Sequence, residues 1–447
     1  AEEPRTVVLV TSDTHRADHL RAGRDSVDVQ TPFLDGLAAR GVLFEDCFAS
    51  TNITLPSHAA LLTGTSPRDS GIVDNITALA DGAETLAERF QAAGFTTLAV
   101  VSARHLRDAQ SGLGQGFDRM LAPASAREVD SSITVDRLLE SLPGLEGRSL
   151  FLWLHVFDAH APYDSPETFR DLYYPAGRDR YDASLPPLKR NAQLSWDPEV
   201  RDPAWARSQY KAEVTYLDSQ LERALSHPRF ETALLAVTAD HGESLGEHGI
   251  YFKHHGLFPN TLWVPLILVA PGVPAGVRVT SPVRQLDLGR TLLDLSGLGA
   301  AVFPGENLLR WTEPDLEAAA EPRFALSSHA LAASLEQDGW FLSLRIVPSV
   351  LPRRVAHQVE LYYLPDDRGC ENDLVESHHE RAREMRARLI EWLNAPRVMG
   401  MQRDGANRAA DLAQLAELGY SDGQAPIPED RPWYEPDPRS AWVRRFE

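Results

Sequence analysis

Apolar and polar residues form two patterns along the N-terminal two thirds of the chain, one typical of buried strands and one typical of helices. Short β-branched and aliphatic runs predict buried strands at residues 6–12, 42–48, 95–101, 149–156, 232–239 and 264–269. Between them, apolar positions recur at helical spacing and predict helices at residues 32–40, 56–63, 84–93, 204–226 and 286–296. Strands that alternate with helices favour a mostly parallel sheet covered on both faces, so we expect an α/β sandwich.

The pattern changes near residue 321. Strand-like runs follow at 324–326, 339–346 and 359–364, and a charged amphipathic helix is predicted over 374–394. A further helix is predicted near 405–418, before a Pro-rich segment with Trp433 and Trp442. We therefore predict a large α/β domain over 1–320, a small α+β subdomain over 321–395, and a tail over 396–447 that packs on the body.

Two of the predicted strands end in acidic residues. Asp13 follows the strand at 6–12, and Asp240 and His241 follow the strand at 232–239. In open α/β sheets, ligands bind outside the carboxyl ends of parallel strands. Carboxylate oxygens favour Mg, Ca or Mn, and an imidazole also admits Zn or Fe. These residues predict a divalent metal site, although strand-end acids can also simply cap loops.

Thr54 lies just ahead of a predicted helix whose first turn contains Pro56. Proline suits that turn because its missing N–H is not needed there. The N–H groups and dipole of a helix N-terminus attract anions, so a hydroxyl at this place could attack a phosphate or a sulfate. The alternative is an ordinary helix cap.

Composition narrows the class of protein. The chain has 447 residues, 43% of them hydrophobic, and a net charge of −20. Such a chain can bury a large core, and it lacks the basic face of a nucleic-acid-binding protein. No apolar run is long enough for a membrane span. The first residues are not a signal peptide, so we expect a soluble protein, either cytoplasmic or exported after removal of a signal. Cys47 is expected to be a core thiol, and a disulfide between Cys47 and Cys370 is the less favoured alternative.

A series of segments, all in one order, resembles the sulfatase branch of the alkaline phosphatase superfamily. They are Val10–Leu20 (VTSDTHRADHL), Thr31–Ala38 (TPFLDGLA), Thr54–Gly64 (TLPSHAALLTG), Asp74 and Asn75, His155–Tyr163 (HVFDAHAPY), Asp240–Gly249 (DHGESLGEHG), Lys253 and Trp263–Leu268 (WVPLIL). The resemblance covers residues 5 to 395 and implies an alkaline-phosphatase-like sandwich with a small C-terminal antiparallel sheet and helix.

The departures from the family pattern bear on the chemistry. Usual sulfatases carry Cys or Ser at the Thr54 position and Arg at the His58 position, a signal for conversion to formylglycine. Many also place a metal-binding Asp where this chain has Thr14. The resemblance therefore implies no formylglycine, a Thr54 nucleophile, and one divalent metal (Mn, Ca, Mg or Zn). Its expected ligands are Asp13, Thr54, Asp240 and His241.

The resemblance also implies substrate-binding roles. Asn75, Lys253 and His160 resemble the substrate-binding residues of phosphonate monoester hydrolases, with His160 or Lys253 as proton donor to the leaving oxygen. Arg16 is expected to add positive charge near the anion. A second metal on Asp158, His160 and His255 is the less favoured variant. The polar insertion at 162–203 follows His160, so we predict that it borders the site.

The expected function is metal-dependent hydrolysis of a small anionic ester: a phosphodiester, phosphonate or phosphate ester. The first alternative is a sulfatase that works without formylglycine, since sulfate and phosphate are both tetrahedral anions. The second is a non-catalytic anion-binding relative. An oligomeric state is left open.

Overall fold

A large mixed sheet forms the centre of the computed structural model, which describes residues 5–124, 128–299, 303–313, 321–348, 354–404 and 432–446. Its strand order is β11-β2-β10-β7-β1-β6-β4-β5, with β12 also paired to β2. The strands are β1 (Thr6–Ser12), β2 (Val42–Phe48), β4 (Thr96–Val101), β5 (Arg119–Leu121), β6 (Leu150–Val156), β7 (Leu234–Ala239), β10 (Trp263–Val269), β11 (Val277–Val279) and β12 (Val283–Arg284). Its described strands pair in parallel except for β10, which is antiparallel to β2 and β7. The expected mostly parallel α/β fold is confirmed.

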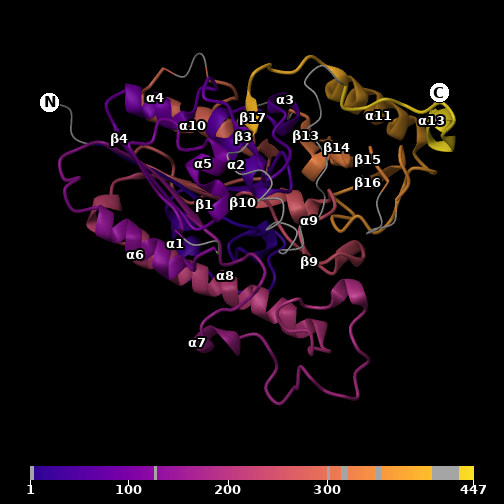
Figure 1. Ribbon diagram of the computed structural model, residues 1–447, viewed down its shortest axis with the longest axis horizontal. Helices are drawn as coiled ribbons and strands as arrows, with labels where there is room; N and C mark the ends of the chain where they lie inside the picture. Colours follow the sequence, from indigo (N-terminus) through magenta and orange to yellow (C-terminus); the bar gives the residue numbers. More distant parts are fainter. Residues whose placement is uncertain are drawn as a thin grey trace.

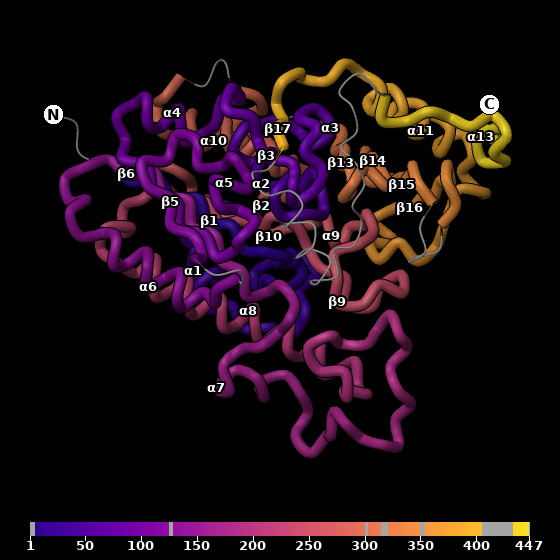
Figure 2. The backbone as a smooth tube through the Cα atoms, in the orientation of Figure 1, coloured from indigo at the N-terminus to yellow at the C-terminus, as the bar shows by residue number. Residues whose placement is uncertain are grey.

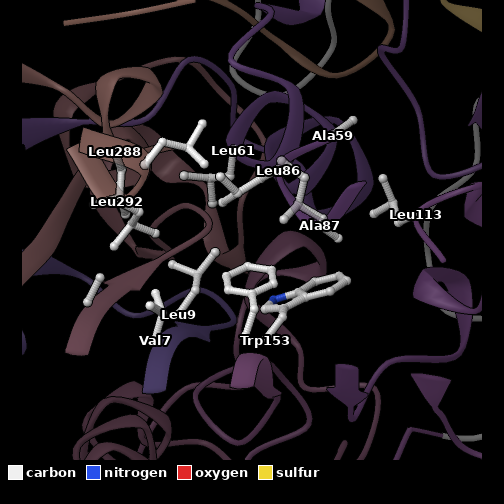
Figure 3. Close-up of a cluster of buried hydrophobic side chains, with 14 of the residues drawn as sticks. Val7, Leu9, Ala59, Leu61, Leu86, Ala87, Leu113, Trp153, Leu288 and Leu292 are labelled. Carbon is white, nitrogen blue, oxygen red and sulfur yellow. The ribbon is translucent and has the colours of Figure 1, made fainter. Parts of the chain in front are cut away.

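Helices cover both faces of this sheet (Figure 1). One face packs against α1 (Pro32–Arg40), α6 (Ser131–Ser141) and α8 (Pro203–Leu225). The other packs against α2 (Thr54–Thr63), α4 (Leu86–Ala92) and α10 (Leu288–Leu295), where Leu9 and Trp153 of the sheet meet Leu61 and Leu292 (Figure 3). Burial on both faces explains why the central strands read as continuous apolar runs.

A second, antiparallel sheet follows in the chain, with order β13-β14-β15-β16. It consists of β13 (Arg323–Leu326), β14 (Ala332–Gln337), β15 (Trp340–Arg345) and β16 (Val359–Tyr363), and α11 (His379–Asn394) packs on it. The expected small C-terminal sheet with a helix is therefore present. Sequence analysis did not predict β14, because its Ala-Ala-Ser-Leu-Glu-Gln segment has few strongly β-forming residues.

The C-terminal segment contacts both parts of the molecule. Strand β17 (Gln402–Asp404) pairs with β3 (Thr77–Leu79) of the large unit. Trp433 is buried and donates its indole N–H to the carbonyl of Arg68 (2.9 Å), while α13 (Ala441–Phe446) packs near α11 (Figure 1). The helix predicted near 405–418 lies outside the described residues.

The insertion after β6 projects from the body of the molecule (Figure 2). It contains α7 (Glu167–Arg170) and is anchored by an aromatic cluster that includes Tyr163, Tyr173 and Trp205. The hydroxyl of Tyr163 donates to the carboxylate of Glu243 (3.3 Å). Because Glu243 lies just beyond His241, the base of the insertion lies next to the predicted site.

Short elements complete the described chain. They are α3 (Pro67–Ser70), α5 (Asp108–Ser111), α9 (Pro259–Leu262) and the hairpin of β8 (Ser244–Leu245) with β9 (Tyr251–Lys253). Cys47 and Cys370 are both buried and unbonded to each other, which leaves Cys47 as the expected core thiol. Over the residues described, the structure contains no helix with the length and apolarity needed to traverse a bilayer.

Candidate active site

Four residues converge at the carboxyl edge of the central sheet. Asp13 follows β1, and Asp240 and His241 follow β7, the strand paired with β1 in parallel, so the two acids lie side by side. Thr54 opens α2, with its hydroxyl 3.4 Å from Nε2 of His241. Nε2 is in turn 3.5 Å from Oδ2 of Asp240 and 4.0 Å from Oδ1 of Asp13. The sequence prediction that these four residues lie together agrees with this geometry.

Thr54 does not serve as a helix cap. The N-cap position of α2 is Ile53, whose side chain makes no capping bond, and α2 begins two residues earlier than the 56–63 range predicted. The hydroxyl of Thr54 is fully buried and faces the acids and His241. The helix-cap alternative for Thr54 is therefore wrong, and its hydroxyl is available for chemistry.

The two carboxylates are buried with too few donors. Both oxygens of Asp13 and Oδ2 of Asp240 have no hydrogen-bond partner, although Oδ1 of Asp240 accepts from the N–H groups of Thr14 (3.0 Å) and His241 (2.7 Å). Burial, reinforced by the charge of Asp240, raises the pKa of Asp13 well above its usual range, and burial raises the pKa of Asp240 to about 6. Unpaired buried carboxylates are costly unless a cation joins them.

The donor set fits a divalent cation. Asp13, Asp240 and His241 each offer a ligand atom within 4.8 Å of the others. Nδ1 of His241 donates to the carbonyl of Gly242 (3.0 Å), and burial lowers its pKa to about 4, so the ring is neutral with a lone pair on Nε2. A carbonyl partner on one ring nitrogen is the usual way to aim the other at a metal. Two carboxylates, one imidazole and a hydroxyl suit Mn, Mg, Ca or Zn.

The structure brings the other predicted site residues to different places. Asn75 is buried, and its Oδ1 accepts from the N–H of Leu55 (2.9 Å), directly after Thr54. His160 is half-buried, with its ring 5.6 Å from that of His254. Lys253 is exposed at the end of β9, one residue before His254. Among the described residues, none of these three belongs to the metal-capable group of Asp13, Asp240 and His241.

Arg16 is held by acids of its own. Its guanidinium bonds to both oxygens of Asp18 (2.9 and 2.6 Å), to Glu247 (2.7 Å) and to the carbonyl of Glu243 (3.1 Å). This network largely neutralises the cation. Arg16 therefore braces the loop after Asp240 rather than supplying an unpaired positive charge.

The trio suggested for a second metal does not assemble. Both oxygens of Asp158 accept from the N–H of Ser131 (3.1 Å) at the start of α6. Burial, with the nearby Asp130, raises the pKa of Asp158 to about 7. Within the described chain, the metal-capable groups contain neither Asp158 nor His160 nor His255.

Two histidines outside the predicted set of site residues lie close to the site. His254 is buried, with its ring 4.5 Å from that of His241 and Nδ1 2.7 Å from the carbonyl of Asn52. His105 lies 3.8 Å from Glu128, and its charge acts to lower the pKa of Asp240 and of His241. The signal for His105 was its position just beyond β4, at the same sheet edge as Asp13.

This combination of fold and site defines an ester hydrolase of the alkaline phosphatase superfamily. Within that superfamily the chain belongs to the sulfatase family, because the family model described as Sulfatase matches residues 5–298. A divalent metal is usual in this family.

Named relatives agree with this assignment. The chain is 26% identical to a sulfatase of Formosa agariphila over 61% of this chain and 66% of that protein. It is also 26% identical to the uncharacterized sulfatase YidJ of Escherichia coli, over 69% and 71% of the two chains. The match thus spans about two thirds of the length of these relatives. They support the sulfate-ester alternative better than the phosphorus-ester prediction.

The solved structures that resemble this chain include an enzyme named for a different activity. The phosphonate monoester hydrolase SpPMH of Silicibacter pomeroyi superposes with a TM-score of 0.67, covering 90% of this chain and 96% of that chain at 20% identity. At this identity the likeness establishes the fold alone. The expected alkaline-phosphatase-like fold is confirmed by it.

Proposed function

We propose that this chain hydrolyses phosphorus esters (phosphodiesters, phosphonates or phosphate monoesters) with Thr54 as the nucleophile. We further propose one divalent metal held by Asp13, Asp240, His241 and the Thr54 oxygen. The observation that carries the proposal is the buried Thr54 hydroxyl, 3.4 Å from Nε2 of a neutral His241 and beside the carboxylates of Asp13 and Asp240, of which both Asp13 oxygens and Oδ2 of Asp240 have no hydrogen-bond partner. A nucleophile activated in this way splits one difficult hydrolysis into two easier steps.

When bound, the metal would neutralise a non-bridging ester oxygen and lower the pKa of the Thr54 hydroxyl. The Thr54 hydroxyl gives up its proton to water, its Oγ1 attacks the phosphorus, the bond to the leaving oxygen breaks, and a covalent Thr54 ester forms. The ammonium of Lys253 donates a proton to the leaving oxygen, with His160 as the second candidate donor. Nδ2 of Asn75 is buried without a partner and would donate to a substrate oxygen. Water then attacks the phosphorus and frees Thr54.

Sulfate ester hydrolysis is the second candidate, and the named relatives favour it. The chemistry of Thr54 favours phosphorus. In the usual sulfatases, a hydrated formylglycine can expel sulfate by collapsing to the aldehyde. A threonine sulfate has no such exit, so it would have to be opened by water attack at sulfur.

The test compares a phosphate monoester, a phosphodiester, a phosphonate and a sulfate that share one aryl leaving group. The metal-loaded protein should turn over at least one phosphorus ester faster than the sulfate, which should give a burst and then slow turnover. Steady turnover of the aryl sulfate above every phosphorus ester would establish the sulfatase alternative instead.

Two controls complete this experiment. Peptide mass spectrometry should find an unmodified Thr54, and an aldehyde-type mass there would contradict the proposed nucleophile. If no ester is turned over, calorimetry with inorganic phosphate and inorganic sulfate should be run. Binding without turnover would favour the non-catalytic relative.

A further inference from the structure

A chain of hydrogen bonds lies beneath Thr54 in the apolar core. The indole N–H of Trp153 on β6 donates to the hydroxyl of Thr11 on β1 (3.0 Å). That hydroxyl lies 3.0 Å from Nε2 of His58 on α2, and Nδ1 of His58 lies 2.8 Å from the carbonyl oxygen of Thr54. Trp153, Thr11 and His58 are fully buried, and Figure 3 shows Trp153 within the apolar cluster under α2.

Each bond in this chain has only one possible direction. An indole N–H can only donate and a carbonyl oxygen can only accept. His58 must therefore carry its proton on Nδ1, and the Thr11 hydroxyl must donate to Nε2. Burial lowers the pKa of His58 to about 4, in keeping with a neutral ring. Hydrogen bonds from strands β6 and β1 and within helix α2 thus fix one tautomer of His58.

The same peptide group is held from its other side. The N–H of Leu55 donates to Oδ1 of Asn75 (2.9 Å), while the carbonyl of Thr54 accepts from His58 (2.8 Å). The peptide unit that joins Thr54 to Leu55 is therefore bound at both its oxygen and its nitrogen. The carbonyl of Ile53, on the preceding peptide, also accepts from the N–H of Ser57 (3.1 Å). Both peptide planes that flank Cα of Thr54 are therefore held, which sets the direction in which Cβ leaves the backbone.

A competing use for His58 is a second metal site. His58, His155 and Asp240 each offer a ligand atom within 4.8 Å of the others, and Nε2 of His155 lies 3.5 Å from Oδ2 of Asp13. Both nitrogens of His58 are, however, already engaged in hydrogen bonds. A metal on His58 would break one of them and leave a buried polar group without a partner, which is unfavourable. The hydrogen-bond chain is the better use of His58.

We propose that His58 is a positioning residue, which with Asn75 clamps the Thr54–Leu55 peptide and so aims the Thr54 hydroxyl at the reacting atom. The proposal rests on the proposed role of Thr54 as nucleophile. It also gives a role to His58 at the position where usual sulfatases carry Arg: the imidazole orients the nucleophile through its backbone and brings no charge to the site.

A pair of substitutions separates the two nitrogens of His58. In His58→Asn, the amide nitrogen can occupy the Nδ1 position and keep the bond to Thr54. In His58→Gln, the amide can reach the Thr11 hydroxyl, but the bond to Thr54 is lost. We expect His58→Asn to keep kcat within about threefold and His58→Gln to lose roughly 10- to 100-fold, since small misplacements can cost 10²-fold. KM and bound metal should be unchanged in both.

A spectroscopic measurement tests the clamp without any turnover. In protein with ¹⁵N-labelled histidine, His58 should show a protonated Nδ1 and a bare Nε2. Thr11→Val should shift the Nε2 resonance, because the donated bond is gone, whereas Thr11→Ser should keep it. Failure of the proposed nucleophile, for example full activity without the Thr54 hydroxyl, would leave this spectrum unaltered.

Three outcomes would overturn the proposal. The first is equal kcat in His58→Asn and His58→Gln, which would remove any special role for the bond to Thr54. The second is a proton on Nε2 of His58 in the wild-type spectrum. The third is a second equivalent of metal that is lost in His58→Gln, which would establish the metal site instead.

Discussion

Two buried groups of charges in this molecule are built in opposite ways. At the junction of the two sheets, the guanidinium of Arg323 bonds to Asp46 (2.7 Å) and Glu336 (2.7 Å) and lies over the ring of Phe48. At the edge of the large sheet, Asp13 and Asp240 are at least as deeply buried. Among the described residues, the only basic side chains within 4.0 Å of these two carboxylates are histidines, which burial keeps neutral.

The difference distinguishes a structural group from a functional one. In the Arg323 group the chain itself supplies the cation, so the charges balance and the acids have donors. In the Asp13 group three of the four carboxylate oxygens, both of Asp13 and Oδ2 of Asp240, have no hydrogen-bond partner, so the site needs an external cation. The comparison is therefore tested by removing the key atoms of each group in turn.

The largest effect is expected from removal of the Thr54 hydroxyl. Thr54→Val keeps the shape of the side chain and should reduce kcat by at least about 10²-fold, and by up to ~10⁶-fold if the covalent step carries the whole reaction. Thr54→Ser should retain measurable turnover, since it keeps an oxygen nucleophile. Initial rates on the best phosphorus ester provide the measurement, and full activity in Thr54→Val would mean that Thr54 is not the nucleophile.

The second effect concerns the structural group. Arg323→Met leaves Asp46 and Glu336 buried without their cation, and should lower the free energy of unfolding by about 3–5 kcal/mol. Bound metal per folded chain should not change. The matched control is Arg439→Ala, because Arg439 forms an exposed ion pair with Asp437 and its loss should leave the free energy of unfolding nearly unchanged. Denaturant melts in which Arg323→Met and Arg439→Ala lower the free energy of unfolding equally would contradict the structural role given to Arg323.

The smallest effect is a pH dependence of the metal-free protein. Burial raises the pKa of Asp240 from 3.8 to about 6, so the folded state binds the proton more tightly than the unfolded state. The stability that this provides is present below about pH 4 and is lost as the pH rises through about 6. The chelated protein should therefore melt at a lower temperature at pH 7.5 than at pH 5.

Other buried acids, such as Glu243, shift in the same direction, so the control is Asp240→Asn. This variant should show a smaller drop in melting temperature between the two pH values than the wild type does. Identical pH profiles in calorimetric scans of the two chelated proteins would show that Asp240 is not strained by burial.

Much of the fold could be predicted from periodicity. The ranges of β1, β2 and α1 agree residue for residue with the predicted ones, because long apolar runs and helical spacing are strong local signals. The antiparallel direction of β10 could not be predicted, since an apolar run does not record strand direction. Helix α6 was missed although it is amphipathic and has Asp130 as its N-cap.

The centre of the site was predictable for a topological reason. Asp13 and Asp240 end strands that are neighbours in the sheet, so strand-end positions alone place them together. The contacts that surround these two residues were not predictable. The bond of His58 to Thr54 follows from i, i+4 spacing on a helix, but its bond to Thr11 joins residues 47 positions apart. Arg16 was expected to face the anion, and only the structure shows the acids that hold it.

The central claim is that the unpaired carboxylates of Asp13 and Asp240 hold a divalent cation. The direct measurement is calorimetric titration of Mn²⁺ into chelator-stripped protein, with elemental analysis of the loaded form, for the wild type, Asp240→Asn and the Arg439→Ala control. We predict one equivalent of metal for the wild type and for Arg439→Ala, and an affinity at least about tenfold weaker for Asp240→Asn, as expected from loss of a charged ligand. A wild-type protein that binds no divalent metal, or an Asp240→Asn variant that binds it with unchanged affinity, would contradict the account.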